Sequence, residues 1–365
     1  MTRDVARTRS RKRSGIHRIS ELADVSIGTV DRALNGRAGI SEATRTKVLR
    51  IAKQLKYAPH PAARALARSR STLRIGVCIP EEIHFFYDQM RLGIFDEARR
   101  AEGLGIELVY RPVAALGKGE DRRLRSLIDA GVSAIIVTPG NPGAVTQLIN
   151  EAEQRGIRVV CITTDAPQSQ RSSVVCVDAA LNGRLAAELM ARFVPDGAKV
   201  AVITGMLEAE EHRLKTEAFF DAFGSSCGGG RVAAVVEGHE SAQRSYLKTT
   251  ALLAEHPDLR GIYVNTVNCL PVCRALHRSA SERRIQLITT DLFPEMLPYF
   301  QDGTIAASIY QDPYLQGQTA VRLLVDLLSH SAAVPAARYL SPGIVLRSNL
   351  HLFREARIAQ VRDSE

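Results

Sequence analysis

Apolar residues follow two different periods along this chain. Between residues 15 and 58, apolar side chains recur every three or four positions, which is the period of a helix. From about residue 72, short continuous apolar runs such as LRIGVCIP (73–80) alternate with segments of helical period. The pattern therefore predicts a small helical domain followed by a larger domain of alternating strands and helices.

Three short helices are predicted in the N-terminal domain. The first is expected at about 17–23; Asp24 suits a turn, and Ser26 and Ser41 suit the N-caps of a second and a third helix. Two short helices joined by a tight turn and braced by a third form a helix-turn-helix unit, whose second helix enters the DNA major groove. The expected inward positions are Ile19, Leu22, Ala23, Val30, Ala33, Leu34, Val48, Ile51, Ala52 and Leu55.

A proline-containing segment, YAPHPAARALARSRS, connects the two domains at 57–71. The prolines end the third helix, and AARALA is too short to be a stable helix alone in water. Supported by DNA or a partner chain, it places Leu66, between Arg64 and Arg68, as a wedge for a minor groove. The alternative is a plain interdomain linker.

Positive charge is concentrated near the N-terminus. Residues 1–74 hold 18 Lys and Arg against 5 Asp and Glu, a net charge of +13, and the remainder holds 30 against 34, a net charge of −4. A basic head on a slightly acidic body indicates that the head binds a polyanion, and double-stranded DNA is the expected partner.

The N-terminal segment closely resembles the DNA-binding headpiece of the LacI/GalR family of bacterial regulators. The resemblance rests on VSIGTVDRALNG (25–36), SEATRTKV (41–48) and ARAL (63–66). It implies that Leu66 is the hinge wedge and that the second helix faces bases or phosphates. The expected DNA-contact residues are Ser26, Ile27, Gly28, Thr29, Asp31, Arg32, Asn35, Arg64 and Leu66.

Asp31 is an acid on a surface expected to meet DNA, where serine is the commoner family residue. Its carboxylate can accept a hydrogen bond from cytosine N4 in the major groove. It can equally pair with Arg32 or Arg37 and orient that side chain. Both interpretations make Asp31 a candidate determinant of the operator sequence.

The larger domain has the pattern of a doubly wound α/β fold with parallel sheets, and its length suggests two lobes. Strands are expected at 73–80, 106–110, 134–139, 158–164, 174–178, 199–205, 231–238, 261–266 and 285–291. Ligands of such folds bind beyond the carboxyl ends of the strands. Polar residues at those ends are therefore candidates for a site, although a strand-end Asp is equally often a helix cap. The candidates are Asp165, Asp178, Asn265, Asn268, Asp291 and Gln311, with the aromatic residues Phe85, Phe86 and Tyr87 after the first strand.

Residues 73–346 resemble the type I periplasmic-binding-protein fold, especially its ribose-binding-like branch. HFFYDQMRLGIFDEA resembles that branch's ligand loop, and EEHRLKTEAFF resembles a segment that supplies a ligand-binding Arg. The resemblance implies a sugar-like effector. The chain departs from the family pattern at Ile83, where the family loop has Asn, and at Ala166, where Arg often follows the Asp, so a phosphorylated, aminated or acidic ligand with Arg213 as its charge partner is the alternative. The effector-binding residues that it implies are Phe85, Phe86, Asp165, Asp178, Arg213, Asn265 or Asn268, Asp291 and Gln311.

Several other functions find little support in the residues. No apolar run approaches the roughly 20 residues of a membrane-spanning helix, and no secretory signal is present, so a cytoplasmic, nucleoid-associated protein is expected. Cys269 and Cys273 stand four apart but make no closed metal site, and core packing explains them better. No phosphate-binding loop or nucleophile with a neighbouring base is seen, so no cofactor and no enzymatic activity are expected.

The sequence thus predicts a homodimeric transcriptional repressor that binds a near-palindromic operator under control of a small effector. The alternatives are a constitutive or architectural DNA-binding protein with a vestigial pocket, and an enzyme built on the doubly wound body. The expected parts are a basic arm (1–14), a helix-turn-helix domain (15–58), a hinge (59–71), an effector-binding domain (72–350; lobe 1 about 72–178 and 312–337, lobe 2 about 179–311 and 338–350) and a tail (351–365).

Overall fold

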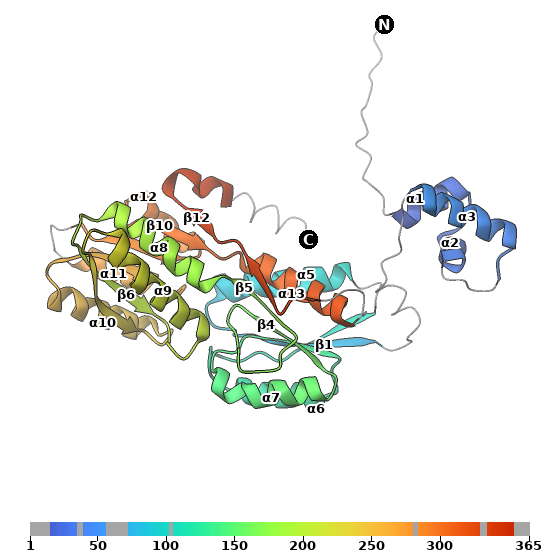
Figure 1. Ribbon diagram of the computed structural model, residues 1–365, viewed down its shortest axis with the longest axis horizontal. Coiled ribbons are helices and arrows are strands. Elements are labelled where there is room, and N and C mark those ends of the chain that lie inside the picture. Colours follow the sequence, from blue (N-terminus) through green and yellow to red (C-terminus); the bar gives the residue numbers. More distant parts are fainter. Residues whose placement is uncertain are drawn as a thin grey trace, which may run out of the picture. The chain divides into compact units, whose positions relative to one another are not determined.

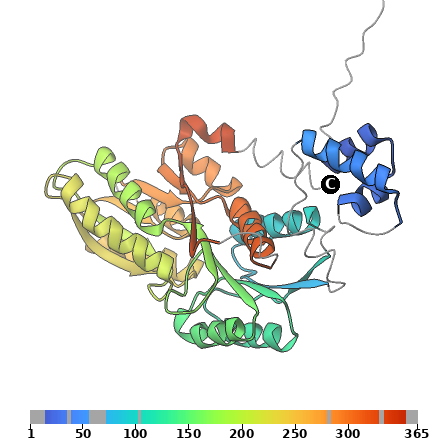
Figure 2. The same ribbon diagram turned by 45° about the vertical axis from the view of Figure 1, so that its right-hand side comes forward.

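The structure is a computed structural model (Figures 1 and 2), and the chain divides into two compact units, Met1–Ser71 and Thr72–Glu365. Several expectations fall outside the described residues: the basic arm, the hinge with Arg64 and Leu66, Asn35, and most of the C-terminal tail. The described residues are 15–34, 39–55, 72–101, 105–279, 284–328 and 334–353.

The first unit contains the three expected helices, α1 (Gly15–Ala23), α2 (Ile27–Leu34) and α3 (Glu42–Gln54). Their apolar faces form one small core of Ile19, Ala23, Val30, Ala33, Val48, Ile51 and Ala52.

Two residues expected inside this core are exposed, and the side chain of Leu34 lies outside the described residues. Leu22 is 50% exposed because it lies about 100° around α1 from its buried neighbour Ala23. Leu55 is 40% exposed because it follows the last residue of α3. The prediction for these two side chains was wrong.

The second unit is a two-lobed α/β structure with one six-stranded sheet in each lobe (Figure 1). The sheet of lobe 1 has the order β11-β5-β4-β3-β1-β2 and is parallel throughout. The elements of lobe 1 are β1 (Leu73–Cys78), α5 (His84–Arg100), β2 (Ile106–Tyr110), α6 (Glu120–Asp129), β3 (Ala134–Val137), α7 (Pro142–Gln154), β4 (Arg158–Ile162), β5 (Ser173–Val177), α13 (Pro313–Leu328) and β11 (Ala337–Leu340).

The sheet of lobe 2 has the order β12-β10-β9-β8-β6-β7, and its edge strand β12 is antiparallel to β10. The elements of lobe 2 are α8 (Ala179–Phe193), β6 (Lys199–Thr204), α9 (Glu210–Ser226), β7 (Arg231–Glu237), α10 (Ala242–Glu255), β8 (Leu259–Val264), α11 (Leu270–Arg278), β9 (Gln286–Thr290), the 3-10 helix η2 (Pro294–Met296), α12 (Leu297–Gln301), β10 (Ile305–Tyr310), β12 (Gly343–Val345) and the 3-10 helix η3 (Arg347–Asn349). The predicted doubly wound, two-lobed fold is confirmed.

The central strands are apolar along their whole length because helices cover both faces of each sheet. In β6, Val200 and Val202 pack in the core beneath α8 and α9, whereas Ala201 and Ile203 pack in the core on the opposite face. Successive side chains of a strand point to opposite faces, so a strand covered on both sides needs a continuous apolar run.

Helices α5 and α13 come from distant parts of the chain and pack closely on lobe 1 (Figure 1). A Cβ placed on Gly93 of α5 would lie 2.1 Å from the carbonyl oxygen of Tyr314, and one on Gly317 of α13 would lie 2.3 Å from the carbonyl oxygen of Met90. Glycine at these two positions lets the helix backbones touch, which fixes the start of α5 beside the cleft between the lobes.

The chain crosses between the lobes three times. The crossings follow β5, β10 and β11, so the third lies at residues 341–342. The expected boundary at 337/338 cuts through β11, a short edge strand whose half-exposed sequence ARYL carries little strand signal. Because the carboxyl ends of strands from both sheets face this region, loops from the two lobes meet there.

Candidate recognition helix and candidate effector cavity

The start of α2 is fixed by hydrogen bonds from side chains. Asp24 adopts a left-handed conformation with a φ of 53°, and Ser20 Oγ donates to the carbonyl oxygen of Val25 at 2.6 Å. Ser26 Oγ then accepts from the backbone N–H of Thr29 at 3.1 Å, as a helix N-cap does. These contacts hold α2 at a defined angle to α1.

The face of α2 opposite the core is open to solvent. Ile27 is 42% exposed, Ser26, Gly28 and Arg32 are exposed, and Thr29 is half-buried. A Cβ on Gly28 would meet nothing closer than Ser26 Oγ at 3.8 Å, so no contact within the described residues requires glycine there. The side chain of Asp31 lies outside the described part of the chain. The exposed face of α2 thus carries Ile27, Gly28 and, in the last turn, Arg32.

A small cavity lies between the two lobes of the second unit. Its volume is about 20 Å³, measured as the space that the centre of a water molecule can occupy, so it has room for about one water. Loops at the carboxyl ends of strands from both sheets surround it, as expected for this fold class. The lining residues are Ile83, Phe86, Tyr87, Leu116, Thr163, Thr164, Glu211, His212, Glu240, Asn265, Thr266, Val267 and Gln311.

Backbone strain is concentrated around this cavity. Ile83, Thr163, Glu240 and Asp291 all have positive φ angles, between 53° and 72°. Such angles are unfavourable for residues with a Cβ, above all for β-branched ones, and they persist where the surrounding structure fixes them. Their position in loops around one cavity marks it as a candidate binding site.

A fully buried lysine organises one wall of the cavity. The Lys215 ammonium donates to Glu211 Oε1 and, at 2.8 Å, to Gln311 Oε1. Gln311 in turn donates through its backbone N and its Nε2 to the two oxygens of Asp291, at 2.9 and 2.7 Å. Burial raises the pKa of Asp291 to about 6, although these hydrogen bonds and Lys215 oppose the rise.

Several contacts join the two lobes. The backbone N of Glu211 in lobe 2 donates to Thr164 Oγ1 in lobe 1 at 3.2 Å. Phe85 of lobe 1 stacks on Phe293 of lobe 2 with ring centroids 3.7 Å apart. A further apolar cluster joins Leu116 of lobe 1 to Met206 and Ala209 of lobe 2. The lobes therefore meet around the cavity in this conformation.

Another part of the cavity wall carries carboxylate and amide groups. Glu240 Oε1 accepts from Thr266 Oγ1 at 2.7 Å and lies 3.7 Å from His212 Nε2. Asn265 Nδ2 donates to the carbonyl oxygen of His212 at 3.1 Å and to Thr216 Oγ1 at 2.8 Å. This wall is therefore rich in hydrogen-bond acceptors.

Four of the predicted effector-binding residues meet at this cavity. Phe86, Asn265 and Gln311 line it, and Asp291 holds Gln311 from behind. Three of these four directly follow a strand of the lobe 2 sheet, which explains why their positions could be predicted.

Other predicted residues have different contacts. Phe85 stacks on Phe293, and both oxygens of Asp165 accept from the guanidinium of Arg171. Asp178 caps α8 by accepting from the backbone N of Leu181 at 2.9 Å. The backbone N of Asn268 lies 3.4 Å from Thr266 Oγ1, and its side chain is not part of the lining.

Arg213 points away from the cavity. Its side chain is 39% exposed, and its guanidinium pairs with Glu210 and Glu217 on the surface of α9. The buried polar residues of α9 are Glu211, His212, Lys215 and Thr216, which form two pairs four residues apart on one face of the helix. The four-residue spacing on α9 could have been noticed in the sequence. The only sequence feature that marks Glu240 is that it is an acidic residue shortly after a predicted strand.

A second cavity adjoins the first at the mouth of the cleft and shares Leu116 with it. Its volume, measured in the same way, is about 450 Å³. Its lining residues are Glu82, Ala115, Leu116, Gly117, Lys118, Met206, Glu208, His239, Ser241 and Arg244. Leu116 packs with Met206 and Ala209 in a small apolar cluster, and Leu116 and Met206 are part of the lining of this second cavity.

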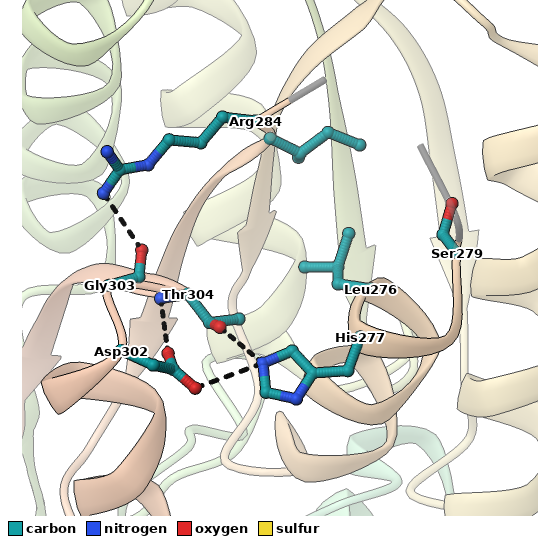
Figure 3. Close-up of a pocket in the computed structure, with 8 residues that line it drawn as sticks. Leu276, His277, Ser279, Arg284, Asp302, Gly303 and Thr304 are labelled. Carbon is teal, nitrogen blue, oxygen red and sulfur yellow. Dashed lines mark hydrogen bonds and ion pairs between the residues drawn. The ribbon is translucent and has the colours of Figure 1, made fainter. Parts of the chain in front are cut away.

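Figure 3 shows another cavity, of about 180 Å³, in lobe 2. It adjoins the residues that precede β9 and β10, so it lies at the amino ends of these strands, away from the cleft. His277 Nε2 lies 2.7 Å from Thr304 Oγ1 and 3.2 Å from Asp302 Oδ2, and Asp302 Oδ1 accepts from the backbone N of Thr304 at 2.8 Å. These polar groups bind one another, so the cavity is a weaker candidate than the cleft.

Within the described residues, no helix is long and apolar enough to cross a membrane, and no three His, Cys, Asp or Glu side chains are placed to hold a metal ion. Cys269 and Cys273 are free and buried in the core of lobe 2. Their burial agrees with the packing role expected from the sequence.

Known proteins resemble both units. The family of bacterial regulatory proteins of the lacI type matches residues 15–60, and the periplasmic binding protein domain family matches residues 75–332. Catabolite control protein A of Priestia megaterium is 27% identical over 259 residues, 69% of this chain and 73% of that protein. The ribose import binding protein of Bacillus subtilis is 24% identical over 263 residues, 71% of this chain and 83% of that protein.

A solved structure shares the fold of the second unit. A glucose-galactose binding protein from Geobacillus stearothermophilus matches with a TM-score of 0.70 and 30% identity, over 77% of this chain and 99% of that one. The protein therefore belongs to the periplasmic binding protein domain family and, with a lacI-type DNA-binding domain at its N-terminus, is a DNA-binding transcription regulator of the LacI family.

Proposed function

We propose that this regulator is a homodimeric repressor and that a small sugar-like effector, bound between the lobes, controls its affinity for a near-palindromic operator. The carrying observation is the strained polar cavity lined by loops from both lobes. We further propose that the protein acts on cytoplasmic DNA and binds its effector without chemically changing it.

On the DNA side, α2 is proposed to enter the major groove. Its exposed first turn, Ser26 to Thr29, and Arg32 are available for bases and phosphates, because Val30 and Ala33 hold the opposite face in the core. A dimer places two such helices on half-sites, so the operator is expected to be a near palindrome.

On the effector side, we propose Phe86 and Tyr87 as the apolar wall and Asn265, Glu240 and Gln311 as the polar contacts. The sugar-binding names of two relatives support a polyol ligand. Because the cavity has room for about one water, a sugar-sized effector enters only when the lobes or the cavity side chains move. That movement is the proposed link between effector binding and the DNA-binding unit.

Selection of bound sequences from random DNA by the full chain tests this proposal. We expect a near palindrome to be enriched and Arg32→Ala to weaken its binding. Repeating the selection with a panel of sugars should change the recovered yield for at least one compound. A palindrome whose binding no compound alters would instead identify a constitutive DNA-binding protein, and binding that depends on salt alone would refute the regulator proposal.

A further inference from the structure

Glu240 is a buried carboxylate without a strongly basic partner. Its side chain is 3% exposed, and its polar neighbours are the Thr266 hydroxyl, at 2.7 Å, and His212 Nε2, at 3.7 Å. Among the described residues, no lysine or arginine lies within ion-pair distance of Glu240. Burying a carboxylate is costly unless a cation or several donors compensate it.

A second carboxylate, Glu82 of lobe 1, lines the cavity that adjoins the one lined by Glu240. Glu82 lies at the mouth of the cleft, where its Oε1 accepts from the backbone N of Leu116 at 2.7 Å. Burial raises the pKa of Glu82, and the charge of Glu240 raises it further, although Leu116 and Lys118 oppose the rise. Glu82 and Glu240 line two adjoining cavities of the cleft, so two negative charges repel across this region, and a cation in the cleft relieves that repulsion.

Asn265 provides independent evidence for a ligand, because one of its buried polar atoms has no hydrogen-bond partner among the described residues. The residue is 0% exposed, and its Oδ1 has no hydrogen-bond partner among the described residues. The orientation of the amide is fixed, because Nδ2 donates to the carbonyl oxygen of His212, a group that can only accept. Asn265 thus presents an unsatisfied acceptor in the lining of the same cavity.

We propose that the effector carries a protonated amine, bound by Glu240 and Asn265 Oδ1 and attracted by Glu82. This inference rests on the proposed function and narrows its ligand from sugars in general to amine-bearing polyols. An ammonium group has three N–H donors and a positive charge. The donors suit the hydrogen-bond acceptors Glu240 and Asn265 Oδ1, and the charge suits the carboxylates of Glu240 and Glu82.

On this proposal, a cationic ligand favours closure of the lobes. With the amine in place, the repulsion between Glu82 and Glu240 becomes attraction of both to one cation. An anionic effector lacks this support, because Lys215 is already paired with Glu211 and Arg213 pairs with Glu210 and Glu217 on the surface. A metal ion is a poorer fit, because no metal-binding cluster occurs among the described residues.

Calorimetry with the full chain tests the inference on matched pairs: glucosamine with glucose, galactosamine with galactose, and mannosamine with mannose. At least one amine is expected to bind about tenfold or more tightly than its neutral partner, and N-acetylation, which removes the charge, should abolish that advantage. Neutral sugars that bind as well as the amines would overturn the inference and leave the proposed function standing. If no compound of either kind binds, the proposed function fails and the inference fails with it.

Glu240→Gln provides the matched variant, and Glu188→Gln the control. Glu188 lies on the surface of α8, 59% exposed and paired with Arg192, and its substitution changes the net charge equally. We expect Glu240→Gln to weaken amine binding about tenfold or more, with little effect on neutral sugars, and Glu188→Gln to change neither. Equal losses for amines and neutral sugars would overturn the role of charge. Should Glu240→Gln fail to fold, the N-acetylation comparison on the unaltered chain decides the question.

Discussion

The buried ion pair between Lys215 and Glu211 can be tested by substituting Lys215. Its side chain is 1% exposed and donates to Glu211, itself 8% exposed, and to Gln311. Lys215→Met preserves much of the side-chain volume and removes the charge. The variant leaves the Glu211 carboxylate buried without its partner and takes a donor from Gln311.

The expected loss follows from this burial. Removing one member of a buried ion pair costs about 3–5 kcal/mol, since the remaining charge is uncompensated. For a unit of this size, at about 2 °C per kcal/mol, the Tm should fall by roughly 6–10 °C. The double variant Lys215→Met with Glu211→Gln removes both charges and should lie within about 1–2 kcal/mol of the unaltered protein, the remainder reflecting the donor lost to Gln311.

The assay is a double-mutant cycle of thermal and urea unfolding on Lys215→Met, Glu211→Gln and the double variant, followed by circular dichroism. The surface variant Arg213→Gln serves as a control, because its ion pairs are exposed and should contribute little. A loss of less than about 1 kcal/mol in Lys215→Met, or a double variant no more stable than Lys215→Met alone, would show that Lys215 does not compensate a buried Glu211 charge.

Two further predictions concern packing and pH. Gly93→Ala should lower the free energy of unfolding by about 1–3 kcal/mol or more, because its Cβ would lie 2.1 Å from the carbonyl oxygen of Tyr314; an unchanged Tm in thermal unfolding would contradict the close contact of α5 and α13. Burial raises the pKa of Asp291 from 3.8 to about 6, so its contribution to stability is complete below about pH 4 and is lost as the pH rises through 6. Asp291→Asn lacks this loss, so its stability relative to the unaltered protein, measured by urea unfolding, should improve between pH 4 and pH 7; a constant difference would show that Asp291 does not titrate in this range.

The fold could largely be predicted because its strands are buried on both faces and its helices on one. The continuous apolar run of β6 exists because two helical layers cover the sheet, so the cause is local and visible in the sequence. The edge strands β11 and β12 are short and half-exposed, and they pair with strands far away in the chain. Their pairing depends on the closed tertiary structure, which no local pattern contains.

The sequence predicted those site residues that directly follow a strand. Asn265 and Gln311 lie at the cavity because the carboxyl ends of parallel strands converge. Arg213 does not lie at the cavity, because Glu211, His212 and Lys215 occupy the inward face of α9. Asp165 depends on a contact with Arg171, six residues later in the same loop, and loop contacts of this kind have no periodic signal.

The central claim is that a ligand held between the lobes controls the affinity of the N-terminal unit for DNA. The most direct test is the Kd of the full chain for its selected operator, measured by fluorescence anisotropy without and with a saturating effector, together with the Kd for the effector without and with operator. Each ligand is expected to change the Kd for the other by the same factor, about 5- to 150-fold. An effector that binds in the cleft and leaves the operator Kd unchanged would contradict this claim.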